Sequence, residues 1–213
     1  MDRQKIIDKT KEYVKSKQQG DATGHDWWHT YRVWQLAVKI GQIEQADLFI
    51  IELAALLHDL EDWKITENQD KDQTKKLLVE LGVEANIIED IVQIIKDLSF
   101  KGAGVATPMK SIEGKIVQDA DRLDAIGAIG IARAFAYGGY KSREIYNPEI
   151  KPILHDSFEQ YKNAVSTTIN HFYEKLFLLK DLMNTETAKA MAEQRHEYME
   201  KFVQEFFKEW DNK

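Results

Sequence analysis

The sequence contains no cysteine, and this absence limits both how the chain is stabilised and what it can bind. Disulfide bonds and thiolate metal sites are excluded, and nothing in the composition indicates an oxidising compartment. Any metal ion must therefore be held by histidine, aspartate or glutamate side chains.

The sequence also lacks a long apolar run and a surplus of positive charge. No stretch approaches the roughly 20 apolar residues of a membrane span, so we expect no membrane association and, most simply, a soluble cytoplasmic protein. The net charge is −7 and the basic residues are dispersed, which argues against polymeric nucleic acid as a partner. A local cationic pocket is still compatible with this charge.

Helical periodicity dominates the chain, and we find no internal repeat, low-complexity tract or convincing strand pair. The 213 residues, 43% of them hydrophobic, are enough for one compact core. We predict an all-α fold and a single domain over residues 1–213, with a metal-site core at about 22–135. The predicted helices cover residues 6–14, 27–40, 46–60, 75–81 and 87–98, then a long helix from Ser111 to about 140, and a closing antiparallel pair at 157–182 and 185–210.

Several boundaries have specific signals. Asp26 or Thr23 could cap the second helix, and Gly41 is the expected end of it. The run at 87–98 is rich in β-branched residues, but its length and its i, i+3, i+4, i+7 spacing favour a helix. Residues 137–152 form the longest irregular stretch, which we interpret as a mobile lid, the alternative being a disordered connector.

Residues 56–62 place an imidazole and three acids after an apolar helix. Adjacent residues on a helix point about 100° apart, so His58 and Asp59 can reach one ion only near a helix end or bend. Further ligands must come from elsewhere. His25 and His29 are four residues apart and either could bind, and the same holds for the acids of the run from 119 to 124, namely Asp119, Asp121 and Asp124.

If His29, His58, Asp59 and Asp121 converge, two imidazoles and two carboxylates leave room for water on a six-coordinate ion. That donor set suits Mn²⁺, Fe²⁺ or related metals better than a closed structural zinc site. Such an ion can lower the pKa of a bound water from 15.7 towards about 7 in the best zinc cases. Hydrolysis is the natural use of this chemistry.

Two acids that follow His58 and Asp59 are candidates for proton transfer. Asp62 could orient the attacking water or carry a proton, and Glu61 is its competitor. The alternative is a solvated acidic cluster, although a helix C-terminus does not favour negative charge. His25 could contact phosphate or carry a proton, or it could simply pack at the start of a helix.

The order His29…His58-Asp59…Asp121 resembles the HD-domain metal-dependent phosphohydrolase superfamily. The stretches at 24–33, 119–125 and 137–140 resemble its YpgQ-type branch, and the similarity continues at 171–176 and 183–185. The resemblance implies these four ligands, because the superfamily pattern has valine four residues after the first histidine and Ala-Asp-Arg-Leu around the last aspartate. It also implies Mn²⁺-dependent pyrophosphohydrolysis of nucleoside triphosphates, with an acid at the position of Asp62 acting in catalysis.

An acidic protein that binds a triphosphate needs cations near the metal. Arg32, one turn after His29, and Arg122, next to Asp121, are the strongest choices, although a solvated role is commoner for any single basic residue. Tyr137 and Tyr140 are the better candidates for base stacking, whereas the tryptophans at 27, 28 and 34 are expected in the core. Further phosphate contacts could come from Lys64, Lys101, Lys115, Arg133, Lys141 and Arg143.

We therefore expect a hydrolase that cleaves (deoxy)nucleoside triphosphates to monophosphate and pyrophosphate with a divalent metal, Mn²⁺ first and Mg²⁺, Fe²⁺, Co²⁺ or Ni²⁺ as alternatives. The runner-up enzyme is a phosphomonoesterase such as a nucleotidase, and a different class is a non-catalytic nucleotide sensor. The partner is a small nucleotide in each case. A homo-oligomer is compatible with the sequence.

Overall fold

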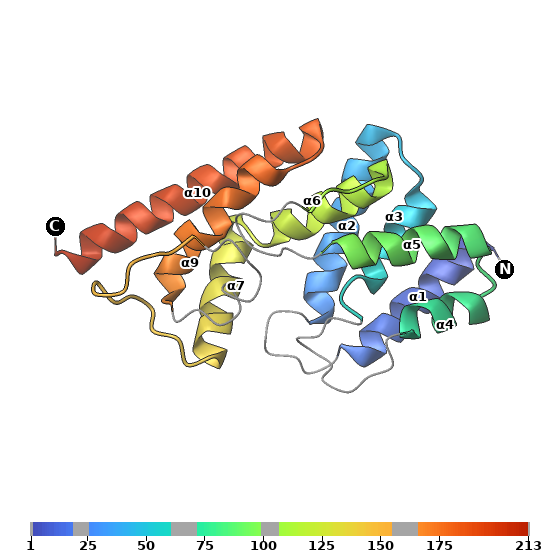
Figure 1. Ribbon diagram of the computed structural model, residues 1–213, viewed down its shortest axis with the longest axis horizontal. Coiled ribbons are helices and arrows are strands. Elements are labelled where there is room, and N and C mark those ends of the chain that lie inside the picture. Colours follow the sequence, from blue (N-terminus) through green and yellow to red (C-terminus); the bar gives the residue numbers. More distant parts are fainter. Residues whose placement is uncertain (1, 19–25, 61–71, 99–106, 155–165, 213) are drawn as a thin grey trace. The chain divides into compact units, whose positions relative to one another are not determined.

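The computed structural model describes residues 2–18, 26–60, 72–98, 107–154 and 166–212, and Figure 1 shows how these residues form helices joined by loops. No strand occurs in these ranges, so the all-α prediction is confirmed. Among the described helices, none combines the length and the hydropathy that crossing a membrane would take.

Contacts divide the chain into two compact units. The first unit takes in the described residues up to Leu98 and from Thr107 to Ala120, and the second begins at Asp121 and includes the C-terminal part of the chain. The border falls inside a continuous helix. Folding as a single domain stays a prediction.

The first unit is built around α3, Leu48–Leu57, which packs against α1, α2 and α5. Nearly every side chain of α3 is apolar, and Ile51, Leu53, Leu56 and Leu57 are all inaccessible to solvent. A helix that is hydrophobic on every face is buried in the core, and the neighbouring helices exclude water from α3. The other helices of this unit are α1 (Arg3–Lys17), α2 (Trp27–Glu44), α4 (Gln73–Glu80), α5 (Ala85–Asp97) and most of α6 (Ile112–Asp124).

Helix caps confirm some predicted boundaries and correct one. The Asp26 carboxylate accepts a hydrogen bond of 2.9 Å from the His29 amide at the start of α2, and Ser111 Oγ accepts one of 3.0 Å from the Gly114 amide. The prediction that α2 ends at Gly41 is wrong, because the helix continues to Glu44. Gly41 serves packing instead, since a Cβ atom there would lie 2.6 Å from Ile51 Cδ1 of α3.

The long helix expected from Ser111 to about 140 is two helices. α6 ends at Asp124 and α7 covers Gly127–Tyr140. Gly127 has φ +75°, a conformation that side chains with a Cβ rarely adopt, and it turns the chain between the two helices. The glycine that the sequence placed inside a helix therefore begins a new one.

The helix expected over 157–182 is also divided within the described residues. α9 covers Thr168–Glu174, and a 3-10 helix, η1, covers Leu176–Leu182. Lys175 lies between them with φ −143° and ψ −58°, outside the helical region. A 3-10 helix superimposes residues three apart, and Leu176 and Leu179 are both buried in this way. The last helix, α10, covers Glu186–Trp210, close to its predicted range.

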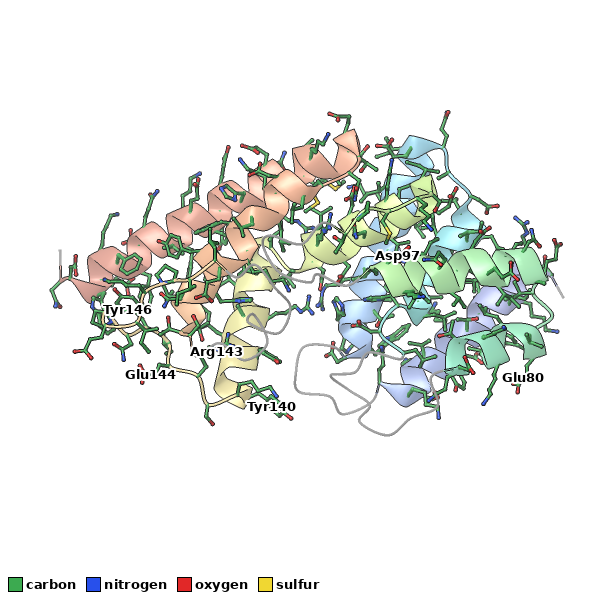
Figure 2. The ribbon with its side chains drawn as sticks, viewed as in Figure 1. Glu80, Asp97, Tyr140, Arg143, Glu144 and Tyr146 are labelled. Atoms are coloured by element: carbon green, nitrogen blue, oxygen red, sulfur yellow. The ribbon has the colours of Figure 1, made fainter. Side chains whose placement is uncertain are left out.

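The irregular stretch expected over 137–152 begins later than predicted, because residues 137–140 form the last turn of α7. Residues 141–154 contain no helix and are tied to α9 by backbone and side-chain hydrogen bonds. The amides of Thr168 and Ile169 donate to the carbonyls of Glu144 and Ile145 at 2.9 and 3.0 Å. Farther along, Asn170 Nδ2 donates to the Ile150 carbonyl at 2.8 Å. Figure 2 labels Arg143, Glu144 and Tyr146 along this stretch. The role of the segment as a lid stays a prediction.

Candidate metal centre

His58 and Asp59 lie where α3 ends. The helix stops at Leu57, and the Leu60 amide donates to the Leu57 carbonyl at 3.1 Å in the turn that follows. This turn meets the condition that adjacent ligands need a helix end to reach one ion. Both side chains are almost fully buried, His58 at 8% and Asp59 at 7% exposure.

A backbone contact sets the orientation of the His58 ring. Its Nδ1 lies 2.8 Å from the carbonyl oxygen of Ala55, which can only accept a hydrogen bond, so the Nδ1 proton is fixed there. The lone pair of neutral His58 then sits on Nε2. This is the arrangement that metal-binding histidines use, in which the second ring nitrogen is anchored by a carbonyl or carboxylate.

The Nε2 atom of His58 points at a second imidazole. His29, in the first turn of α2 and fully buried, places its own Nε2 3.3 Å from His58 Nε2. Asp59 Oδ2 lies 3.2 Å from His29 Nε2 and 3.5 Å from His58 Nε2. Two ring nitrogens and a carboxylate oxygen directed at one another attract a cation, whether a proton or a metal ion.

Asp121 of α6 completes the group. One ligand atom from each of His29, His58 and Asp121 lies within 4.8 Å of the others, with both histidines buried and Asp121 partly exposed. Nitrogen and carboxylate donors without sulfur suit a divalent metal ion. Three of the four residues implied as ligands, His29, His58 and Asp121, therefore form one group that could hold a metal, and Asp59 lies beside it through its contacts with both imidazoles.

The structure bears on the alternatives that the sequence leaves open. Asp124, the rival of Asp121 at the end of α6, is buried and forms an ion pair with Arg133 at 2.9 Å. Asp119 is fully buried, and the group that could hold a metal contains Asp121. The candidates that lie outside the described residues are His25, Glu61, Asp62, Lys64 and Lys101, and their roles stay predictions.

The described phosphate candidates occupy different environments. Arg32 on α2 and Lys115 on α6 are partly buried. Arg122 is almost fully buried, and its guanidinium donates to the Leu182 carbonyl at the end of η1, which gives it a structural contact. Arg143 follows α7, where its backbone amide donates to the Gly138 carbonyl at 2.8 Å. None of these observations tests a phosphate role.

Of the two tyrosines proposed to stack on a base, Tyr140 is exposed and Tyr137 is partly buried. Tyr137 and Tyr140 lie at the end of α7, and Lys141 Nζ sits 5.7 and 5.2 Å from their ring centroids. Trp27 is buried as expected, whereas Trp34 is only partly buried and its Nε1 donates to Glu52 Oε2 at 2.9 Å. Trp28 differs from the expectation of core packing, since 59% of it is exposed.

Sequence reasoning missed two supports of the site. The Ala55 carbonyl that anchors His58 lies three residues before it, a helical spacing that could have indicated the contact. Arg195 of α10 donates to the Leu123 carbonyl at the end of α6, and no local signal marks a partner so distant in sequence.

The fold and the site define a class, the all-α proteins with a candidate metal centre built from imidazoles and a carboxylate. Comparison with known proteins shows which family within this class the chain belongs to. The HD domain model matches residues 27–126. YpgQ of Bacillus subtilis is 42% identical over 208 residues, covering 96% of this chain and 94% of YpgQ. A crystal structure of YpgQ in complex with ADP has a TM-score of 0.77 at 40% identity, over 95% of this chain and 97% of the other.

Two further crystal structures cover all of this chain and all of their own. A Lactobacillus plantarum protein has a TM-score of 0.86 at 39% identity. An HD-superfamily hydrolase of Bacillus thuringiensis has a TM-score of 0.78 at 44% identity. The chain belongs to the HD superfamily of metal-dependent phosphohydrolases, in the branch that YpgQ represents.

Proposed function

We propose that the protein hydrolyses (deoxy)nucleoside triphosphates to nucleoside monophosphate and pyrophosphate, with a divalent ion, Mn²⁺ first, held by His29, His58, Asp59 and Asp121. The observation that carries the proposal is the convergence of the His29, His58 and Asp121 ligand atoms within 4.8 Å. The ADP in the YpgQ crystal structure supports a small nucleotide as the ligand.

The chain's own groups account for several parts of the reaction. The Ala55 carbonyl holds the His58 ring so that Nε2 faces the centre, and Asp59 contacts both imidazoles. When bound, the ion supplies Lewis acidity that lowers the pKa of a water molecule and offsets phosphate charge. In the proposed step the water oxygen attacks the α-phosphorus, and the bond to the bridging oxygen breaks with release of pyrophosphate.

Proton transfer and substrate binding use residues that the sequence singled out. Asp62 is the first candidate to accept the proton of the attacking water, with Glu61 and His25 as alternatives. Tyr137 is the proposed stacking partner of the base. Cations proposed to contact phosphate oxygens are Arg32, Lys64, Lys101, Lys115, Arg122 and Arg143.

Product identification tests the proposal. Metal-stripped protein would be incubated with and without Mn²⁺ against nucleoside triphosphates and monophosphates. His58→Ala is the test variant, and His196→Ala is the control because His196 lies on α10, where it pairs with Glu200 at 3.3 Å. We expect monophosphate and pyrophosphate only with metal, a loss of at least about 100-fold in His58→Ala, and wild-type rates in His196→Ala.

Other outcomes would replace the proposal. Inorganic phosphate released from monophosphates would identify a nucleotidase. Tight binding of nucleotide that is recovered intact under every metal would favour the sensor. Because the histidines must be neutral to bind metal, we also expect the affinity for Mn²⁺ to fall as pH is lowered, which a titration at several pH values would measure.

A further inference from the structure

The position of Asp121 depends on how the end of α6 is held. Asp121 lies in the last turn of a helix that ends at Asp124. The Ala125 amide donates to the carbonyls of both Asp121 and Arg122 at 3.2 Å, and the Ile126 amide donates to the Leu123 carbonyl at 3.2 Å. Helix ends fray unless something fixes them, so a ligand in the last turn needs external support.

Arg195 of α10 supplies one such support. Its guanidinium donates a second hydrogen bond to the Leu123 carbonyl. Its aliphatic stem lies against Gly127, where an added Cβ atom would be 3.0 Å from Arg195 Cγ. One side chain therefore contacts the last turn of α6 and the first residue of α7. A cation at a helix C-terminus also interacts favourably with the helix dipole.

A buried ion pair holds the same turn from α7. Arg133 NH1 lies 2.9 Å from Asp124 Oδ2, and the Asp124 side chain is only 5% exposed. Asp124 is also near Arg195: burial lowers the pKa of Arg195, and the charge of Asp124 opposes that shift. A buried carboxylate that loses its partner is strongly unfavourable, so this pair fixes the end of α6 firmly.

We propose that Arg195 and Arg133 are positioning residues for the metal ligand Asp121, holding the turn after α6 so that its carboxylate stays within reach of His29 and His58. The proposal rests on the metal role of Asp121 in the proposed function. Neither arginine belongs to the ligand group, and Arg195 lies 72 residues from Leu123 in sequence. Outer partners of metal ligands typically change metal affinity by about 10- to 100-fold when removed.

A metal titration without substrate tests the proposal. Metal-stripped protein would be titrated with Mn²⁺, with free Mn²⁺ followed by electron paramagnetic resonance. Arg195→Met keeps the aliphatic stem and removes the donor. Val203→Ala is the matched control, because Val203 is buried on the same helix, eight residues beyond Arg195, and its truncation is expected to destabilise the protein. Thermal unfolding of the metal-free proteins records the loss of stability in each variant.

We expect Arg195→Met to weaken Mn²⁺ binding by about tenfold or more, with Val203→Ala within about twofold of the wild type. Arg133→Met should weaken binding by at least about threefold, and it carries the test if Arg195→Met does not fold. Wild-type affinity in the folded arginine variants would overturn the proposal, as would an equal loss in Val203→Ala. If the wild-type protein bound no Mn²⁺, that result would instead contradict the proposed metal centre and with it the proposed function.

Discussion

The two units of the chain bury different kinds of side chain. The core of the first unit is largely aliphatic, with residues such as Ile51, Leu53 and Leu56 fully buried. In the second unit, aromatic rings pack in a continuous series. Phe172 contacts Phe135, Phe177 and Phe202 at centroid separations of 6.3, 6.0 and 5.9 Å.

The units also differ in how their non-helical backbone is held. In the second unit, side chains reach backbone groups far away in sequence, as Asn170 does to Ile150, Arg122 to Leu182 and Arg195 to Leu123. In the first unit, most side-chain contacts to backbone join residues within three positions of each other, as at Asp26 and Ser111. Helical periodicity predicted the helices of the first unit and α10 of the second, but it missed the breaks after α6 and after α9.

The largest expected effect comes from the aromatic packing. Phe172→Ala removes a fully buried ring and should lower the free energy of unfolding by about 3–5 kcal/mol, and Leu56→Ala in the first unit by about 2–5 kcal/mol. Urea denaturation followed by circular dichroism measures both. If the chain is a single domain, each variant shifts one common transition. Two transitions, each moved by only one variant, would show that the units unfold separately.

The next comparison uses neighbouring glycines at the end of α7. A Cβ atom on Gly138 would lie 2.3 Å from Thr168 Oγ1 of α9, whereas one on Gly139 meets nothing within 4 Å. Gly138→Ala should therefore lower the free energy of unfolding by about 1–3 kcal/mol. Gly139→Ala should raise it by up to about 1 kcal/mol, because alanine has the higher helix propensity. Thermal unfolding of both variants checks the difference in sign. Equal changes in the unfolding temperature of the two variants would contradict this explanation.

A smaller effect tests the attachment of residues 141–154. Asn170→Ala removes the donor to the Ile150 carbonyl. It should lower the local stability of residues 141–154 by about 1 kcal/mol and leave the rest of the chain unchanged. Hydrogen exchange measured by mass spectrometry should show faster exchange there, with the amides of α3 unchanged. An exchange pattern like that of the wild type would mean that the other contacts to α9 suffice. A lower KM in this variant would support the predicted lid.

The smallest effect concerns Glu52 in the first unit. Burial raises its pKa above the ordinary value of 4.5, while the hydrogen bond from Trp34 opposes the shift. An acid whose pKa is raised by folding reduces stability as pH rises through that pKa, because the buried carboxylate is disfavoured. The free energy of unfolding of Glu52→Gln, relative to that of the wild type, should therefore rise between about pH 4 and pH 7. The rise should be less than about 1 kcal/mol, because Glu52 is partly exposed. Urea midpoints across that range measure it, and a gain that appears only at low pH would contradict the sign.

Much of the candidate site could be predicted because its signals are local. An apolar run that stops at His58-Asp59 indicates both a buried helix and its end, which is where two adjacent ligands can converge. The choice of His29 over His25, and of Asp121 over Asp119 or Asp124, came from resemblance rather than from periodicity. The structure adds a physical reason in one case, the ion pair that Asp124 forms with Arg133.

The sequence by itself determined the all-α class, most helix positions in the first unit and the donor atoms available to a metal, because these depend on composition and on spacing within a few turns. Tertiary structure alone decided the break at Gly127, the 3-10 turn after Lys175 and the support of α6 by Arg195. Two of these features involve a distant partner, because Arg195 donates to the Leu123 carbonyl and packs against Gly127. Local propensity carries no information about such partners, so only the folded arrangement could reveal them.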